Sequence, residues 1–311
     1  MKAVKLKPAC KDYLWGGTKL KTDYGIEADL DKIAEAWVLS CHKDGASVIE
    51  NGEYKGFSLA EAIDKAGSEI LGTNCAKFEF FPILIKLIDA KDNLSIQVHP
   101  SDEYALRVEG EYGKTEMWYV VDCEPNSYLY YGFNRVIDKK EFARRIEDNT
   151  LTEVLNKVEV KKGDCFFIAS GTIHAIGAGI LIAEIQQNSN TTYRVSDYGR
   201  LGADGLPREL HVDKALDVTI LAPPSAAYGE IKTENGEAAL ASCKYFTVNK
   251  LEISGEKTIN VDETSFVSLL CLSGNVEFED ISLKAGECAF IPAGAGEITL
   301  SGEGEVIVSR V

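Results

Sequence analysis

Three separated segments of the sequence carry side chains that could bind a metal ion. They are Gln97 and His99 in LSIQVHP, Glu116 in YGKTEMWYVV and His174 in GTIHAIG, and each lies among residues typical of β-strands. Side chains alternate along a strand, so Gln97 and His99 share one face and can converge without a turn. Imidazole nitrogen, carboxylate and amide oxygen without thiolate suit zinc best, with manganese, iron or cobalt as alternatives.

A histidine on a half-buried strand is more often a hydrogen-bonded core residue than a metal ligand. Neither histidine therefore carries the metal prediction alone. The strand neighbour Gln97 and the glycine turn before His174 favour the metal site. The other two of the four histidines, His42 and His211, have no such neighbours, and we interpret them as structural.

The chain has a globular composition and an acidic balance. It has 311 residues, of which 45% are hydrophobic and 26% charged, and its formal net charge is −16. This length allows about two domains, or one large β domain with additions. The acidity argues against nucleic acid and anionic membranes as partners, because both attract basic patches. An anionic ligand would need a local group of cations, for which the candidates are Lys86, Lys114, Arg194 and Arg200.

Two features of the sequence bear on the cellular compartment. It contains no apolar stretch long enough to span a membrane, and its first residues lack the apolar run of a signal peptide. Its eight cysteines are scattered singly, without a CxxC pair. Such cysteines are typical of reduced core thiols. We therefore expect a cytoplasmic protein.

Most of the chain has the pattern of short strands separated by turns. The predicted strands are rich in β-branched and aromatic residues and are bounded by Gly, Asn, Asp or Ser. They cover residues 93–99, 115–122, 126–133, 164–170, 179–187, 246–253, 265–272, 287–293 and 305–311. Many closely spaced strands predict a sandwich, a jelly roll or a barrel.

Helical insertions are predicted at about 56–72, 138–158 and 207–221. Ser58 and Glu61 form a capping-box signature, which is followed by apolar residues at helical spacing. The second insertion contains two helical stretches, which begin near Asp138 and Thr150. Pro207 is suited to the first turn of the third.

A faint internal repeat suggests two related β-barrel halves. VKKGDCFFIASGTIHAIG (160–177) and LKAGECAFIPAGAGEITL (283–300) share a pattern of glycine, acid and cysteine that aligns Gly163 with Gly286. His174 then falls opposite Glu297, so we expect only the first half to bind metal. The predicted division is a larger domain over 1–222, a linker over 223–240 and a smaller C-terminal domain over 241–311 without a metal site.

These motifs, together with the run IAEIQQNSNTTYRVSDYGR, resemble those of type I mannose-6-phosphate isomerases, specifically the short bacterial form. The resemblance begins at the YLWGG and EAWVLS segments and reaches about residue 221, and the last third is weakly diagnostic. It implies a mainly β cupin fold, the double-stranded β-helix or jelly roll, with two barrel-like halves and a few inserted helices. It also implies one zinc ion per chain and the interconversion of mannose 6-phosphate and fructose 6-phosphate.

The resemblance assigns expected roles to individual residues. The zinc ligands would be Gln97, His99, Glu116 and His174. Arg194 matches an active-site arginine, Glu184 an acid beside the substrate and Lys114 a cation near the metal, so these form the expected catalytic set. Lys86, Ser95 and Arg200 match positions that resemble a phosphate cradle. Asn190 stands where other members of the wider family carry an aspartate, so we assign it no acid–base role.

The implied reaction moves a proton between C2 and C1 of the sugar through an enediol. Zinc would polarise the sugar oxygens, and Arg194 would add a permanently charged donor beside them. The base would be Glu184 or a hydroxide bound to zinc, because a carboxylate in a partly dry cavity can have its pKa raised toward neutrality. Lys114 could instead orient the substrate.

Two other functions stay open at this point. An iron-dependent cupin dioxygenase could use the same histidines and glutamate, but it would not need cations around an anion. A non-catalytic sugar-phosphate-binding cupin would not need Glu184 or an intact ligand set. The expected partner is a small sugar phosphate, and the chain is expected to be a monomer or a homodimer.

Overall fold

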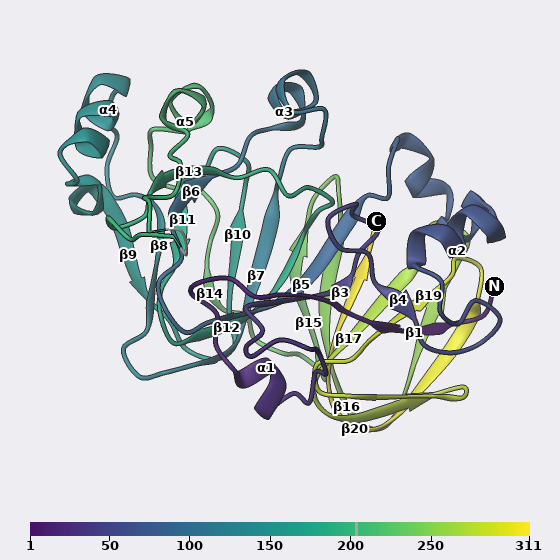
Figure 1. Cartoon of the computed structure of the whole chain (residues 1–311). Coiled ribbons are helices and arrows are strands. Elements are labelled where there is room, and N and C mark those ends of the chain that lie inside the picture. The colour runs from purple at the N-terminus through teal and green to yellow at the C-terminus, as the bar shows by residue number, and fades with distance from the viewer. Residues whose placement is uncertain (203–204) are drawn as a thin grey trace.

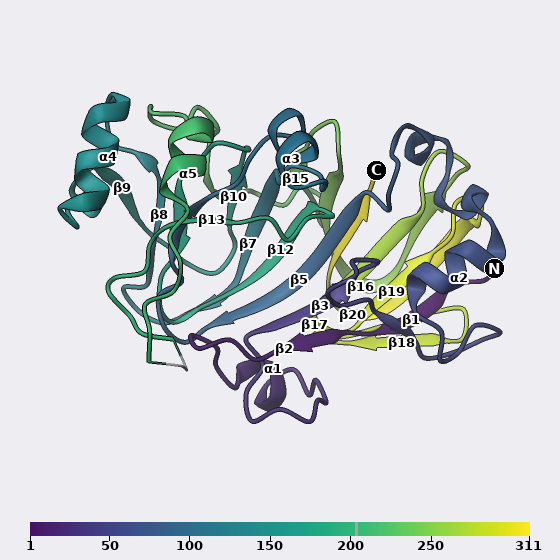
Figure 2. The ribbon, with the colours of Figure 1, turned by 45° about the horizontal axis from the view of Figure 1, so that its top comes forward.

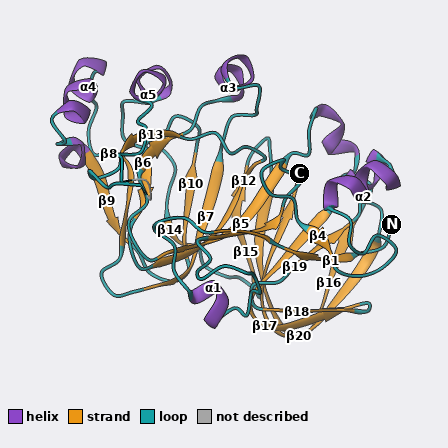
Figure 3. Cartoon of the chain, in the orientation of Figure 1, coloured by secondary structure: helices purple, strands orange, loops and turns teal. Residues whose placement is uncertain are grey.

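Three antiparallel sheets make up most of the molecule, and short helices lie at its periphery (Figures 1 and 3). The computed structural model describes residues 1–202 and 205–311. The sheets have five, seven and eight strands. The prediction of a mainly β fold is confirmed. In the described part of the chain, no helix is both long and apolar enough to cross a membrane.

The seven-stranded sheet has the order β14-β10-β7-β12-β5-β3-β2. Its strands are β14 (Gly229–Glu230), β10 (Asp164–Ile168), β7 (Glu116–Cys123), β12 (Ile180–Gln187), β5 (Ile83–Ala90), β3 (Glu35–Leu39) and β2 (Ala9–Lys11). The five-stranded sheet has the order β13-β6-β11-β8-β9. Its strands are β13 (Tyr193–Ser196), β6 (Ile96–Val98), β11 (His174–Ile176), β8 (Tyr128–Phe133) and β9 (Leu155–Glu159).

The eight-stranded sheet contains most of the C-terminal residues. Its strands are β15 (Glu237–Ser242), β16 (Thr247–Val261), β20 (Gly296–Arg310), β17 (Val267–Phe278), β19 (Cys288–Ile291), β1 (Val4–Lys7), β4 (Val48–Ile49) and β18 (Ile281–Lys284). In Figure 2 these yellow-green strands lie on the side of the molecule where both termini are found. Because β1 and β4 pair into this sheet, it also contains N-terminal residues. The division into domains at 222 stays a prediction, and β15 begins inside the expected linker.

Alternation along the central strands decides which side chains of the seven-stranded sheet face the five-stranded sheet. On β12, Ile180 and Ile182 pack in the core between this sheet and the five-stranded sheet. Leu181, Ala183 and Ile185 pack on the opposite face, against the eight-stranded sheet. Because the side-chain period is two, Glu184 lies on the same face as Ile180 and Ile182.

Each pair of layers encloses an apolar core. Trp118 and Tyr131 pack between the five- and seven-stranded sheets, and Met117 and Phe290 pack between the seven- and eight-stranded sheets. A third core, which includes Leu269, fills the inside of the C-terminal barrel.

The helices are α1 (Lys19–Thr22), α2 (Leu59–Ala66), α3 (Asp102–Val108), α4 (Lys139–Glu147) and α5 (Val212–Val218), with 3₁₀ helices η1 (Ser68–Leu71), η2 (Thr73–Lys77) and η3 (Leu151–Val154). The capping box of Ser58 and Glu61 is present at α2. Residues 155–158, which we expected to be helical, form part of β9 because they pair with β8. Pro207 does not start the third helix, since α5 begins at Val212. No sequence signal led us to expect α3.

The glycines of the internal repeat have the same conformation in both halves. Gly163 has φ of 94° and Gly286 has φ of 86°, and they precede β10 and β19. Such positive φ values favour glycine. Glu297, which the repeat aligns with His174, is exposed on β20 rather than turned into the barrel. The absence of a metal site from the C-terminal half stays a prediction.

Gly113 sets the close approach of two loops that border the functional site. A β-carbon at this position would overlap with the backbone of Ser101 and Asp102. We expect Gly113→Ala to lower the free energy of unfolding by about 2 kcal/mol, because neither backbone can move without disturbing Lys114 or His99. Gly45→Ala is the control, since a β-carbon there would be 3.1 Å from its nearest atoms, compared with 2.4 Å at Gly113. It should change stability by less than about 1 kcal/mol. Urea denaturation measures both, and equal effects would contradict the close-packing argument.

Candidate metal centre and active site

The predicted metal ligands come together inside the N-terminal barrel. Strand pairing places His174 of β11 directly opposite Gln97 of β6. Glu116 reaches them from β7 in the facing sheet. One ligand atom from each of His99, Glu116 and His174 can be chosen so that all three lie within 4.8 Å of one another. The structure therefore brings together these three residues from separate segments.

The geometry of this group fits a metal ion. His99 Nε2 lies 3.6 Å from Glu116 Oε2, and His174 Nε2 lies 3.4 Å from Glu116 Oε1. The three side chains are at most 1% exposed. Among the described residues, His99 Nε2 and Glu116 Oε1 have no hydrogen-bond partner. Buried polar atoms without partners are costly, and a shared cation would satisfy them.

Hydrogen bonds behind the imidazole rings fix their orientation. His99 Nδ1 lies 2.9 Å from the Thr191 carbonyl oxygen, and His174 Nδ1 lies 2.9 Å from the Thr172 carbonyl oxygen. Each Nδ1 must donate to its carbonyl, which leaves the Nε2 lone pair free to bind a metal. Burial lowers the pKa of His174 to about 4, and burial and then Lys114 lower the pKa of His99 well below its usual range. Both rings are therefore neutral near pH 7, as metal ligands must be.

Gln97 lies at the edge of the group and is only partly buried. Its Nε2 is 3.4 Å from His174 Nε2, and its Oε1 is 3.5 Å from Ser95 Oγ. A half-turn of the amide would exchange the oxygen and the nitrogen, which differ little in size. Gln97 is thus close enough to add an oxygen ligand, and that role stays a prediction.

A buried row of alternating charges runs from the ligand group across the sheet. Lys114 Nζ lies 2.9 Å from Glu116 Oε2 and 3.5 Å from Glu184 Oε1. Lys86 Nζ lies 3.4 Å from the same Glu184 oxygen and 3.5 Å from Glu35 Oε2. Glu184 sits directly opposite Lys86 because β12 and β5 pair in that register. The sheet register thus places each lysine between two carboxylates.

These neighbours set the protonation of the two glutamates in opposite directions. Burial, followed by the charge of Glu184, raises the pKa of Glu116 to about 7. Burial also acts to raise the pKa of Glu184, but Lys114 and Lys86 together outweigh it and lower that pKa to about 2. The expected rise of the Glu184 pKa toward neutrality is therefore not found, because the two lysines outweigh burial. Its carboxylate is ionised at neutral pH because two ammonium groups flank it.

A cavity of about 300 Å³ opens beside this row. Six of the expected site residues line it, namely Lys86, Ser95, Gln97, Lys114, Glu184 and Arg194. His99, Glu116 and His174 lie behind this lining and are almost fully buried. The cavity wall also includes Tyr13, Trp15, Glu35, Asn190, Thr192 and Arg208, to which the sequence analysis gave no role. Trp15 belongs to the YLWGG motif, so the sequence could have indicated it as a site residue. Arg208 lies in an irregular loop, where no pattern indicates such a role.

The three arginines near the cavity differ in their surroundings. Arg194 donates from Nη1 to the Glu209 carbonyl oxygen at 2.9 Å, and its buried Nε has no partner among the described residues. Arg208 holds Asp197 with two hydrogen bonds of 2.6 and 2.7 Å. Arg200 also binds Asp197, at 2.5 Å, but it is not part of the cavity wall. Arg200 as a phosphate ligand therefore stays a prediction that this geometry does not favour.

Comparison with known protein families gives two matches along the chain. Residues 3–126 match the model described as phosphomannose isomerase type I, catalytic domain. Residues 236–311 match the model described as mannose-6-phosphate isomerase, cupin domain. His174, Glu184 and Arg194 lie between the two matched ranges.

Individual relatives match over nearly the whole chain. The mannose-6-phosphate isomerase ManA of Bacillus subtilis is 39% identical over 98% of both chains. The mannose-6-phosphate isomerase of Streptococcus mutans is 38% identical over 96% of this chain and 94% of its own.

Solved structures agree with these matches. The crystal structure of the mannose 6-phosphate isomerase from Bacillus subtilis has a TM-score of 0.89 and 35% identity, with all of both chains covered. A single-residue variant of the phosphomannose isomerase from Salmonella typhimurium has a TM-score of 0.81 over 99% of both chains, and at 20% identity it supports the fold alone. Full-length identity, fold and the buried ligand group agree, and the chain belongs to the type I phosphomannose isomerase family, in its short Bacillus-like form.

Proposed function

We propose that this chain interconverts mannose 6-phosphate and fructose 6-phosphate, with one zinc ion bound by His99, Glu116 and His174. The observation that carries the proposal is the row of buried charges that joins this ligand group to the wall of the cavity. The relatives that match nearly the whole chain bear the name mannose-6-phosphate isomerase. An aldose–ketose isomerase needs a metal or acid at the sugar oxygens, a nearby carboxylate and an anion site, and the cavity offers candidates for each.

Zinc is the metal that the donor set favours. Two neutral imidazoles and a carboxylate form a common catalytic zinc set, and Gln97 is the candidate for a further oxygen ligand. When bound, zinc would polarise the sugar oxygens and stabilise negative charge that develops on them. Lys114 lies between Glu116 and Glu184. From there its ammonium group can donate a hydrogen bond to the sugar oxygens.

Glu184 is our candidate for the group that moves the proton between C2 and C1. It lies on the cavity wall, and its Oε1 accepts no hydrogen bond from the described residues. Trp118 Nε1 donates to its other oxygen at 3.0 Å and holds the carboxylate in place. Because Lys86 and Lys114 keep Glu184 ionised, it can accept a proton without losing one first. The same lysines make it a weak base, so its position beside the sugar carbons must supply most of its effect.

The phosphate group would bind at the arginine side of the cavity. The wall carries four cationic side chains, Lys86, Lys114, Arg194 and Arg208, against two carboxylates. Lys86 and Lys114 are engaged by the row, whereas the Nε of Arg194 is free to donate. Arg194 is thus the strongest candidate for the anion. Arg208 lies on the same wall but already binds Asp197, and Ser95 offers a hydroxyl there. A dioxygenase would have no use for this surplus of cations.

Two broader expectations remain proposals. All eight cysteines are free thiols, which fits a reducing compartment such as the cytoplasm. A monomer or a homodimer stays a prediction.

The activity can be tested directly in deuterated water. The zinc-loaded protein should convert mannose 6-phosphate to fructose 6-phosphate, which NMR of the sugar detects together with any deuterium gained at C1 or C2. The Glu184→Gln variant should retain zinc but convert the sugar at least about a hundredfold more slowly, because it cannot accept the proton. The absence of fructose 6-phosphate with zinc fully loaded would refute the proposal.

Zinc affinity should depend on pH through Glu116. The metal binds the ionised carboxylate, whose pKa without metal is raised to about 7. Below that pH the affinity should fall about tenfold per unit, and above it the affinity should level off. His174, with its pKa lowered to about 4, should not compete over this range. Competition with a coloured chelator between about pH 5 and pH 8 measures the slope, and a flat profile would contradict this role of Glu116.

Histidine variants test which side chains bind zinc. His174→Ala should lower the zinc content of the purified protein, since it removes one of the three converging ligands. His211→Ala should keep its zinc, because His211 instead binds the Arg194 backbone. Equal zinc in both variants would mean that the ligands are misassigned.

Arg194 should matter for turnover and not for zinc. Arg194→Ala should keep its metal content and lose about 10²- to 10³-fold in kcat, the range typical for removal of one positioned donor. Arg107→Ala, which removes an exposed arginine on α3, should leave kcat unchanged. Steady-state kinetics with mannose 6-phosphate compares the two, and a normal rate for Arg194→Ala would exclude it from the mechanism.

A further inference from the structure

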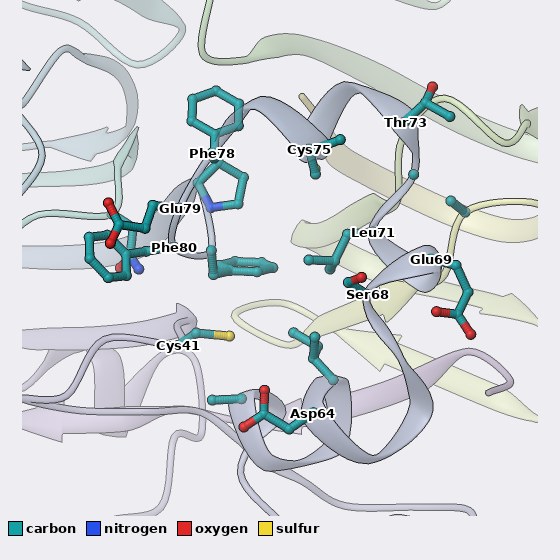
Figure 4. A pocket seen from close by; sticks show the side chains of 18 of the residues that line it. Cys41, Asp64, Ser68, Glu69, Leu71, Thr73, Cys75, Phe78, Glu79 and Phe80 are labelled. Atoms are coloured by element: carbon teal, nitrogen blue, oxygen red, sulfur yellow. The ribbon is translucent and has the colours of Figure 1, made fainter.

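A second and larger cavity lies away from the proposed active site. Its volume is about 940 Å³, and it lies between the helical segment from α2 to residue 82 and the turns of the C-terminal barrel (Figure 4). Cys41, which follows β3, and Asn188, which follows β12, complete its wall. The size falls within the range of roughly 300–1,000 Å³ that is typical of small-molecule sites.

The cavity has an aromatic and aliphatic lining. Leu71 and the Cys41 thiol point inward in Figure 4. Phe81 stacks on the core residue Phe266 at a ring distance of 5.2 Å. Phe80 packs edge-on against Tyr112 at 5.4 Å. Phe81 is buried by this stacking, so an apolar surface is present before any ligand arrives.

The polar groups of the cavity are acceptors or neutral. Its wall contains no lysine, arginine or histidine, but it contains the carboxylates of Asp64, Glu69, Glu79 and Glu263. All four of these carboxylates are exposed, and none of them forms an ion pair with a described residue. Asn188 is 9% exposed, and no described residue donates a hydrogen bond to its Oδ1. A ligand that fills this space can therefore bring hydrogen-bond donors and positive charge.

We propose that this cavity binds an organic ammonium ion with an apolar body, such as an aryl- or alkylamine. The body would cover Leu71 and Phe81, and the aromatic faces would also attract the cation. The ammonium group would donate to Asn188 Oδ1 and to the unpaired carboxylates, of which Asp64 and Glu79 are the candidates. Anions such as the proposed sugar phosphate would be repelled by the same carboxylates.

The segment that contains Asn188 also connects this cavity to the metal group. Asn188 lines the large cavity, whereas Asn190 and Thr192 line the smaller one. Between them, the Thr191 carbonyl oxygen accepts the hydrogen bond from the metal-ligand candidate His99. An amine bound at Asn188 would thus act on the backbone that orients His99. It would thereby change the KM of the isomerase for its sugar phosphate. That effect rests on the proposed function, whereas the binding does not.

Binding can be tested with matched probes. Calorimetric titration of the zinc-loaded protein with 2-phenylethylammonium should give saturable binding. The control ligand 3-phenylpropionate has a similar apolar body and the opposite charge, and it should bind at least tenfold more weakly. The double variant Asp64→Asn with Glu79→Gln should weaken amine binding at least tenfold and leave basal isomerisation unchanged. Glu256→Gln, an exposed change on β16, should alter neither.

The outcomes separate binding from coupling. The proposed site would be overturned if the amine does not bind, if it binds the double variant equally well, or if 3-phenylpropionate binds as tightly. The Asn188→Leu variant should lose amine binding while circular dichroism reports an intact fold, and unchanged binding would also overturn it. In the parent protein, saturating amine should shift the KM for mannose 6-phosphate at least twofold, and an unchanged KM would refute the coupling. If the protein binds the amine but isomerises no sugar, the proposed function fails and the site stands.

Discussion

The buried row of charges is the constraint on which the rest of the structure depends. Glu35, Lys86, Glu184, Lys114 and Glu116 alternate in sign across one face of the seven-stranded sheet. Removal of one partner from such a buried arrangement leaves an uncompensated charge and typically costs about 3–5 kcal/mol. Each member of the row is therefore stabilised by its neighbours. The row also keeps Glu184 ionised, and it places Lys114 beside the carboxylate of Glu116.

The sheet register makes this row possible. Four neighbouring strands, β3, β5, β12 and β7, place the charged side chains on one face, while the opposite face packs in an apolar core. A slip of one residue in β12 would move Glu184 into that core and leave both lysines without it. The paired strands β6 and β11 fix Gln97 opposite His174 in the same way. The metal group and the row are thus two products of strand pairing, and helices contribute only at the periphery.

Local patterns could predict a mainly β fold and the residues that gather as candidate metal ligands, but not the electrostatics. The shared face of Gln97 and His99 follows from alternation within one strand, so it needs no tertiary information. The pKa of Glu184 depends on lysines from neighbouring segments, and their register cannot be derived from local patterns. Residues 155–158 have apolar spacing that suits a helix, yet pairing with β8 makes them a strand. Arg208 comes from an irregular loop, where no periodicity indicates which way a side chain points.

The C-terminal barrel has a physical role in the site even though its own interior is apolar. Its sheet covers the back of the seven-stranded sheet, where Ile85, Met117 and Ile185 pack in the core shared with Phe290. This cover keeps water away from the sheet that carries the charges, and charges interact more strongly where water is excluded. Strands from both ends of the chain build the covering sheet, since β1 pairs with β19. The second barrel can therefore support the chemistry of the first without contributing a ligand or a lining residue to its cavity.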